Sequence, residues 1–233
     1  MIDIAENIRK IRARIANTAL ACGRSPESIT LLAITKTFPV ETISRAIEAG
    51  QRHFGENRVQ EAEPKILALA SRAHLEWHMV GHLQSNKARR AAEIFDVIHS
   101  VDSIKLAEKL SQASVTLGKQ LSVLLQVDLG HEPTKFGIDP KEIREILAAI
   151  LNLKGIRVNG LMIIPPFFEN AEQARPCFAQ LRDLRDALES EQPACLGQQQ
   201  LSMGMSHDFE VAIQEGSTLV RIGTAIFGER SHG

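Results

Sequence analysis

Residues 31–50 read LLAITKTFPVETISRAIEAG, a short apolar run that ends in a lysine and leads directly into a helical pattern. Pro39 is typical of a first helical turn, and Gly50 is a natural residue to follow a helix end. Ile43 and Ile47, four residues apart, would lie on one helix face. The stretch therefore predicts a buried strand followed by an amphipathic helix, and the same order recurs along the chain.

Apolar runs alternate with helical patterns from this unit to the end of the 233-residue chain. The alternation is typical of parallel strands joined by helices, and about eight units are the number that closes a (β/α)8 barrel. An open, doubly wound sheet is the alternative that the same pattern permits. No Ser/Gly-rich linker interrupts it, so the sequence predicts one α/β domain over residues 1–233, a TIM-type barrel. The predicted strands are Ile29–Thr35, His53–Gly55, Glu76–Val80, Val97–Ser100, Ser122–Val127, Val158–Ile163, Gln200–Ser202 and Thr218–Ile222.

Two further helix starts carry local signals. The segment DPKE at 139–142 offers Asp139 as an N-cap and Pro140 at the first helical position. Another helix is predicted to begin at Ser206 and to stop near Gly216. At the N-terminus, charged residues interrupt the apolar ones, which is not typical of a signal peptide and predicts an extra amphipathic helix. The apolar stripe of that helix is Ile4, Ile8, Ile11 and Ile15.

The amino-acid composition argues against several classes of function. Lys and Arg number 27 against 28 Asp and Glu, which leaves a formal charge of −1 and no basic excess for nucleic acid. No apolar run is long enough to span a membrane. Cys22, Cys177 and Cys195 are far apart and form no CxxC motif, so neither a disulfide framework nor a zinc site is indicated. We expect a cytoplasmic monomer.

Lys36 ends the first predicted strand and has two interpretations. An amine in a partly dry pocket becomes a nucleophile that can form a Schiff base with a carbonyl compound. Alternatively, the side chain extends to the rim or pairs with a carboxylate such as Glu56. Asn57, in HFGENRVQE, follows the second strand as either a pocket amide or a helix N-cap.

The last two strands end in stretches that suit an anion. Ser202 and Met203, in LSMGMSHDFE, precede a helix start with hydroxyls and free amides. Gly223 and Thr224, in LVRIGTAIFG, can direct amides and a hydroxyl at a phosphate. Arg221 shares a strand face with Gly223 and would be a cation inside the barrel, where a carboxylate ion pair is the structural alternative.

Two motif matches are rejected on geometry. Ser-His-Asp at 206–208 opens a helix, and consecutive residues there cannot adopt a catalytic triad. His78 and His82 have the spacing of a helical zinc pair, but they flank a strand end and no third ligand accompanies them. We expect no metal, Trp77 in the core and a polar rim that includes His82 and Lys87.

Barrel closure makes the first and eighth strands neighbours, which would bring the amine of Lys36 beside phosphate-binding turns. A phosphorylated aldehyde fits that arrangement, and pyridoxal 5′-phosphate (PLP) is the obvious candidate. At this point the sequence resembles the pyridoxal phosphate homeostasis proteins, which have the barrel of alanine racemase. The matching stretches are LLAITK, HFGENRVQE, LEWHMVGHLQSNK, KFGI, GLMIIPP, LSMGMSHDFEVAI and GSTLVRIGTAIFG.

The resemblance implies a PLP fold-type III barrel without the C-terminal β-domain of alanine racemase. It implies that Lys36 carries PLP as an internal aldimine and that Arg221 faces the pyridine nitrogen. It places Ser202, Gly223 and Thr224 around the phosphate, with Asn57 and Met203 lining the pocket.

A carrier or buffer of PLP is the function that these residues favour. Arginine stays protonated and leaves the pyridine nitrogen uncharged, which makes the ring a weaker electron sink. In the alanine racemases the second base is a tyrosine, and this chain contains no tyrosine. We expect PLP and amino acids as ligands and transient contact with apo-PLP enzymes. The alternatives are a racemase-like PLP enzyme acting on a small amino acid and a barrel enzyme that uses Lys36 as an aldolase-like amine. Lys87 and Lys135 are candidates for a secondary amine site.

Overall fold

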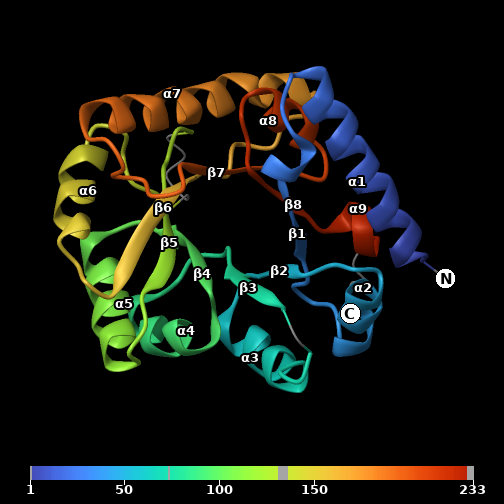
Figure 1. Ribbon diagram of the computed structural model, residues 1–233, viewed down its shortest axis with the longest axis horizontal. Coiled ribbons are helices and arrows are strands. Elements are labelled where there is room, and N and C mark those ends of the chain that lie inside the picture. The colour runs from blue at the N-terminus through green and yellow to red at the C-terminus, as the bar shows by residue number, and fades with distance from the viewer. Residues whose placement is uncertain (1, 73, 131–135, 230–233) are drawn as a thin grey trace.

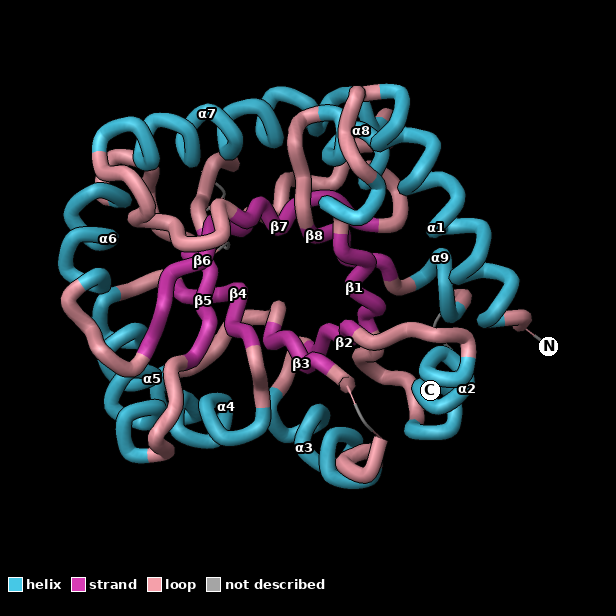
Figure 2. The backbone as a smooth tube through the Cα atoms, viewed as in Figure 1, coloured by secondary structure: helices cyan, strands magenta, loops and turns pink. Residues whose placement is uncertain are grey.

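Eight parallel strands form a closed ring, surrounded by helices (Figures 1 and 2). The computed structural model describes residues 2–72, 74–130 and 136–229. Strand β1 pairs with β8, through Thr30 opposite Leu219 and Ala33 opposite Ile222, which excludes the open sheet. The strands are β1 (Thr30–Ile34), β2 (His53–Glu56), β3 (Glu76–Met79), β4 (Val97–Val101), β5 (Leu121–Gln126), β6 (Ile156–Met162), β7 (Gln200–Met205) and β8 (Leu219–Ile222). All eight predicted strands are confirmed, with shifted ends.

The helices lie outside the strand ring (Figure 2). The α-helices are α1 (Ile4–Ala21), α2 (Val40–Glu48), α3 (Val59–Ala68), α4 (Ala88–Ile94), α5 (Ile104–Thr116), α6 (Ile143–Leu151), α7 (Arg175–Glu191), α8 (Phe209–Gln214) and α9 (Thr224–Phe227). Three short 3-10 helices accompany them: η1 (Pro26–Ser28), η2 (Ser85–Lys87) and η3 (Ala171–Ala174).

Helix α1 confirms the predicted N-terminal helix. Its buried residues are the predicted isoleucine stripe and Ala19, and the carboxylate of Asp3 accepts a hydrogen bond from the backbone N–H of Glu6 at 3.0 Å. The stripe packs against α2, α8 and α9, so α1 covers the seam where β8 meets β1 (Figure 1). Each fully buried isoleucine contributes about 1.5–3 kcal/mol, so this helix ties both ends of the described chain together.

Two helix starts differ from the predictions. The carboxylate of Asp139 accepts from the backbone N–H of Lys141 at 2.8 Å, which closes a turn, and α6 begins only at Ile143. At the other, Asp208 accepts from the backbone N–H of Met205 at 2.6 Å, and α8 begins at Phe209. In the first segment this Asx-type bond competes with helix initiation, and in the second the carboxylate of Asp208 accepts from an N–H three residues earlier and closes the turn that precedes the helix. The sequence signals were correct for the position of a turn and wrong for the first helical residue.

The strand residues divide into two packing layers because successive side chains point to opposite faces. Outward residues join the large core beneath the helices, which includes the predicted core residue Trp77. Inward residues form two small apolar clusters: Leu32, Ile34 and Val80 in one, and Leu124, Met162 and Leu219 in the other. The remaining barrel interior contains polar side chains, and these determine the chemistry described below.

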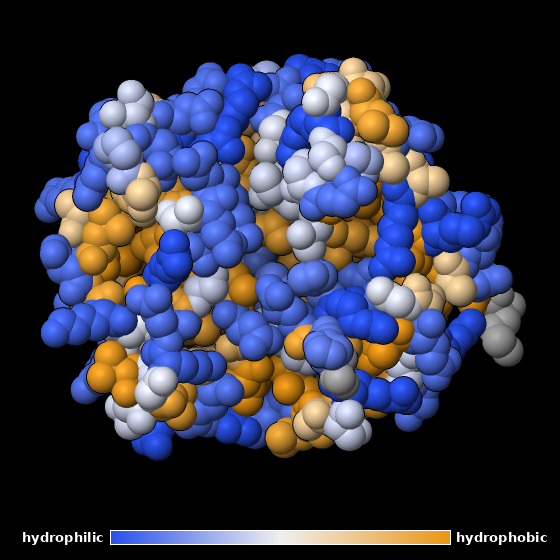
Figure 3. Space-filling model, viewed as in Figure 1, coloured by the Kyte–Doolittle hydropathy of each residue, from blue (hydrophilic) through white to orange (hydrophobic). Residues whose placement is uncertain are grey.

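No described helix has both the length and the apolar character needed to cross a bilayer. Exposed large hydrophobic residues are distributed over several elements, for example Leu20 on α1, Leu67 on α3 and Val115 on α5. On the face shown in Figure 3, hydrophobic groups form separate patches among hydrophilic ones.

The cysteines are expected to differ sharply in reactivity. Burial raises the pKa of the Cys195 thiol to about 11, whereas Cys22 is exposed. The thiolate is the nucleophile, and at pH 8 about a thousandth of a thiol with that pKa is ionised. We expect a colorimetric thiol reagent to label Cys22 rapidly in the native protein and Cys195 only after denaturation. Equal labelling rates at both positions would contradict this packing.

Candidate functional site

A cavity of about 480 Å³ opens at the carboxyl ends of the strands. That volume falls in the range of about 300–1,000 Å³ typical of small-molecule pockets, and this end of a barrel is where such sites lie. Five predicted site residues line the cavity together: Lys36, Asn57, Arg221, Gly223 and Thr224. Barrel closure therefore brings the chain segments after β1, β2 and β8 to one place, as the sequence predicted.

Lys36 is half-buried and lies two residues after the end of β1. The residue before it, Thr35, donates its hydroxyl to Glu56 Oε1 at 2.6 Å, and its backbone carbonyl accepts from Lys65 Nζ at 2.9 Å. Lys65 also lies 2.9 Å from Glu56 Oε1. Glu56 is fully buried, and desolvation raises the pKa of its carboxyl, although the hydroxyl of Thr35 and the ammonium of Lys65 oppose that rise.

Thr37, the residue after Lys36, is also held in place by a contact from α3. Thr37 has a φ of 70°, in the left-handed region that a threonine rarely adopts. Its backbone N–H donates to the carboxylate of Glu61, which also pairs with Lys65 at 2.9 Å. Strained backbone persists only where surrounding contacts enforce it. The buried Glu56–Lys65 pair and the partly exposed Glu61 thus fix the backbone on both sides of Lys36.

Arg221 lies inside the barrel with 4% of its surface exposed. Its Nη1 donates to Ser202 Oγ at 2.7 Å and its Nη2 to the carbonyl of Ile163 at 2.7 Å. Both of these partners are neutral oxygens, and among the described residues Arg221 forms no ion pair with a carboxylate. Burial lowers the pKa of Arg221 to about 10, and nearby Asp208 opposes the shift. The guanidinium is an oriented donor at the cavity wall.

Ser202 and Met203 lie outside the cavity lining. The Ser202 hydroxyl is fully buried and lies 2.9 Å from His99 Nδ1, and His99 Nε2 lies 2.9 Å from His78 Nδ1. Burial lowers the pKa of both imidazoles, so both are neutral at physiological pH. Met203 is completely buried in the outer core. These two residues support Arg221 and the strand, and do not face the cavity.

Ser206 is the site residue that the sequence-based assignment missed. Its Oγ accepts from the backbone N–H of Gly223 at 3.3 Å and lies 3.4 Å from that of Ala225. Ser206 also lines the cavity. A hydroxyl and two backbone amides therefore converge where β7 and β8 end, in the arrangement that favours a phosphate.

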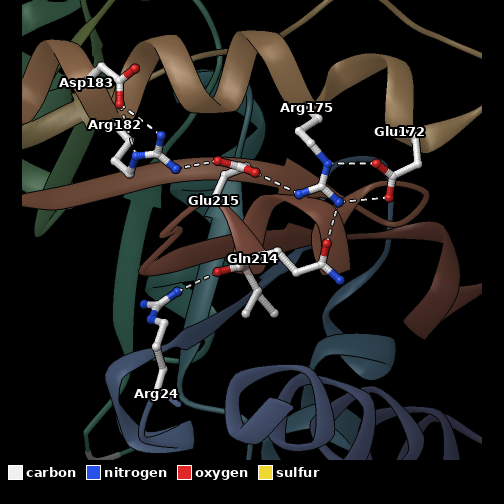
Figure 4. A network of polar contacts seen from close by, with 8 residues as sticks. Arg24, Glu172, Arg175, Arg182, Asp183, Gln214 and Glu215 are labelled. Atoms are coloured by element: carbon white, nitrogen blue, oxygen red, sulfur yellow. Dashed lines mark hydrogen bonds and ion pairs between the residues drawn. The ribbon is translucent and has the colours of Figure 1, made fainter. Parts of the chain in front are cut away.

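The other wall of the cavity comes from the segment after β6. Ile164, Phe168 and Ala171 line it, and η3 carries Ala171. Figure 4 shows how η3 is held: Arg175 bridges Glu172 and Glu215, each at 2.7 Å. Arg182 on α7 also bonds to Glu215, which follows the end of α8. This network fixes the apolar wall against the helix that follows β7.

The remaining predicted rim residues have separate places. His82 lines the cavity, stacks on the ring of Phe136 with centroids 3.5 Å apart and lies 3.3 Å from Asp102. Lys87 ends η2. Lys135 falls outside the residues that the structure describes. Asn57 is not a cap, because α3 has Arg58 at the N-cap position.

Gly81 allows the segment after β3 to pack closely against the backbone of Asn57, beside the cavity. A Cβ at this position would lie 2.4 Å from the carbonyl oxygen of Asn57 and 2.8 Å from its Cα. We expect Gly81→Ala to lower the free energy of unfolding by about 1–3 kcal/mol, because backbone must move to relieve the clash. Denaturant titration measures this. Gly130→Ala is the matched control, since among the described residues its Cβ would meet nothing closer than 3.5 Å. An equally small effect at both glycines would refute the argument.

Residues 3–231 match the family described as "Alanine racemase, N-terminal domain". A "Pyridoxal phosphate homeostasis protein" of Escherichia coli K12 is 44% identical over 241 residues, covering 100% of this chain and 99% of that protein. A protein of the same name from Pseudomonas aeruginosa is 46% identical over 234 residues, covering 100% of this chain and 98% of that protein.

Solved structures agree with this relationship. PipY of Synechococcus elongatus, with PLP bound, superimposes with a TM-score of 0.86 at 42% identity, covering 97% of this chain and all of that one. Alanine racemase of Clostridium difficile shares the fold alone, with a TM-score of 0.71 at 17% identity, and this chain spans 57% of it. By its full-length relatives, the chain belongs to the pyridoxal phosphate homeostasis family, whose barrel is that of the N-terminal domain of alanine racemase.

Proposed function

We propose that this protein binds PLP through Lys36 as a lysine aldimine and acts in PLP homeostasis as a carrier or buffer. One observation carries the proposal: a single cavity gathers the amine of Lys36, the guanidinium of Arg221 and the Ser206–Gly223–Thr224 turn. A phosphorylated aldehyde needs an amine at one end of the pocket and an anion site at the other. The names of the full-length relatives and the PLP in PipY support the same ligand.

The residues present fit PLP group by group. Backbone amides and hydroxyls after β7 and β8 would hold the phosphate, and Arg221 would donate to the pyridine nitrogen. Ile34, Val80 and Phe168 supply apolar surface at the cavity wall for the ring. Bound PLP would supply a carbonyl carbon that exchanges amines. The chain's own contribution is to fix the amine of Lys36, because Thr35 and Thr37 on either side of it are anchored.

Arg221, which would face the pyridine nitrogen, favours storage of PLP over catalytic turnover of amino acids. Arg221 is held by two neutral oxygen acceptors and remains a donor at neutral pH, because its pKa of about 10 lies well above the physiological range. A pyridine nitrogen facing a donor of this kind stays unprotonated, which weakens stabilisation of a carbanion. The absence of tyrosine from the sequence removes the usual second base of the racemase relatives. We therefore propose reversible binding without sustained catalysis.

Mixing experiments test this function. Added PLP should give the protein an absorbance band near 420 nm, as expected of a Schiff base. PLP-loaded protein mixed with an apo-PLP enzyme should restore that enzyme's activity, at a rate at least equal to PLP release into buffer. Neither L- nor D-amino acids should be turned over. Sustained racemisation or transamination by the pure protein, abolished by Lys36→Ala, would instead establish the enzyme alternative. A protein that stays colourless with PLP would contradict both.

A further inference from the structure

Three metal-ligating side chains meet at the mouth of the barrel opposite the cavity. His53 is the first residue of β2 and Glu76 the first residue of β3, and the two residues pair directly in the sheet. His78 lies two residues further along β3, on the same face as Glu76. The cavity lies at the carboxyl ends of the strands, whereas this cluster lies at their amino ends. The cluster therefore does not belong to the PLP site.

The two imidazoles each present a buried nitrogen without a hydrogen-bond partner: His53 Nδ1 and His78 Nε2. Both nitrogens face the same carboxylate, with His53 Nδ1 3.6 Å from Glu76 Oε2 and His78 Nε2 3.2 Å from Glu76 Oε1. One ligand atom from each residue lies within 4.8 Å of the others. Buried polar atoms normally form well-aligned hydrogen bonds, whereas these two nitrogens have only a long or poorly aligned contact with one carboxylate, which needs an explanation.

A bound cation supplies that explanation. Zinc bonds to imidazole nitrogen and carboxylate oxygen at about 2.0–2.2 Å, so tetrahedral ligands around it lie about 3.4 Å apart. The two nitrogen–oxygen distances, 3.2 and 3.6 Å, bracket that value. Two histidines and one carboxylate form a known donor set for zinc, with a fourth position left for water. These two distances run to different oxygens of Glu76, and the three ligand atoms lie within 4.8 Å of one another, so the side chains would draw together by up to about 1.4 Å around one ion.

The surroundings of His78 have the form of a metal ligand's supporting contacts. Its Nδ1 lies 2.9 Å from His99 Nε2, and His99 Nδ1 lies 2.9 Å from Ser202 Oγ. A metal-bound histidine usually donates its other N–H to a fixed acceptor, which sets the tautomer. With Nδ1 donating to His99, the Nε2 lone pair of His78 is directed at the cluster. Ser202 Oγ can accept from both His99 and Arg221, so this tautomer satisfies the whole chain.

An ion can reach the cluster from solvent. The side chains of His53 and Glu76 are 36% and 41% exposed, while His78 is buried. From these contacts we propose that His53, Glu76 and His78 bind a divalent transition-metal ion of the zinc class at the amino-terminal mouth of the barrel. The sequence analysis rejected His82 as a metal-binding partner of His78 and expected no metal; His82 lies at the other mouth, where it lines the cavity.

Calorimetric titration of the full-length, chelator-treated protein with Zn²⁺ tests the site. The protein carries Cys22→Ser, so that the exposed thiol does not compete. We expect one equivalent to bind, and at least a 100-fold loss of affinity in Glu76→Gln and in His53→Ala. Both residues are partly exposed, which keeps these variants folded. His207→Ala, which removes an exposed histidine at the cavity, is the matched control and should bind normally.

A second measurement does not depend on affinity. In protein labelled with ¹⁵N-histidine, one equivalent of Zn²⁺ should shift His53 Nδ1 and His78 Nε2 and leave His82 unchanged. Absence of stoichiometric binding, or binding that Glu76→Gln leaves intact, would overturn the proposal. The cluster would then be an ordinary histidine–carboxylate contact. PLP is not needed in either experiment, so this result is independent of the proposed function.

Discussion

Lys36→Ala is expected to abolish the absorbance band near 420 nm and to weaken PLP retention by about 100-fold, equivalent to about 2.8 kcal/mol. The variant keeps the phosphate turn and Arg221, so noncovalent binding persists, but the carbon–nitrogen bond cannot form. Equilibrium dialysis with spectroscopy measures both effects. The side chain is half-buried at a strand end, so a folded variant is expected.

Lys87→Ala serves as the matched control, because Lys87 ends η2 and does not line the cavity. That variant should keep the wild-type spectrum and PLP retention. A Lys36→Ala protein that retains the band would show that another amine holds the cofactor. Loss of the band in both variants would also contradict the assignment to Lys36.

Lys65→Met is expected to have the largest effect on stability, a loss of about 3–5 kcal/mol. Removing one member of a buried ion pair leaves an uncompensated charge, here the carboxylate of Glu56. The carbonyl of Thr35 loses its 2.9 Å bond from Lys65 at the same time. Denaturant titration measures the loss. Lys10→Met, which removes an exposed partner of Glu6, should change stability by no more than about 0.5 kcal/mol.

The stability loss of Lys65→Met is expected to depend on pH, and the direction of that dependence can be predicted. Burial raises the pKa of Glu56 above its ordinary value of 4.5, and Lys65→Met removes a partner that opposes the rise. The native state then binds more protons than the unfolded state between the two pKa values, so stability falls as pH rises through that window. The variant should therefore lose more stability at pH 8 than at pH 5. Double replacement, with Glu56→Gln added, should recover part of the loss. No recovery would contradict a charge-based explanation.

The sequence could predict the eight strands because each barrel strand is covered on both faces and reads as an apolar run. The end of strand β7, however, was not predicted correctly from this apolar pattern. The prediction stopped it at Ser202, but the strand continues to Met205 through Gly204, at a φ of 93°, with a register shift against β8 between Ser202 and Met205. The loop position facing the phosphate turn therefore belongs to Ser206.

Contacts between side chains that are far apart in the chain could not be predicted from the sequence. Nothing in residues 56–65 indicates that Lys65 reaches back to the strand before Lys36, because that contact depends on how α3 packs on β2. The histidines of β2, β3 and β4 likewise share the barrel interior only once the register is known. By contrast, Lys36, Arg221 and Gly223 were predictable, since strand alternation and barrel closure determine their faces. The single-domain organisation and the monomeric state stay predictions.

Borohydride reduction of the PLP-loaded protein, followed by peptide mass mapping, tests whether Lys36 holds PLP as a Schiff base. Reduction converts a Schiff base into a stable amine and marks the residue that carried it. We predict one equivalent of pyridoxyl label, on the peptide that contains Lys36 and on no other. Label on Lys87, Lys135 or any other lysine in place of Lys36, or no label on a protein that has bound PLP, would contradict it.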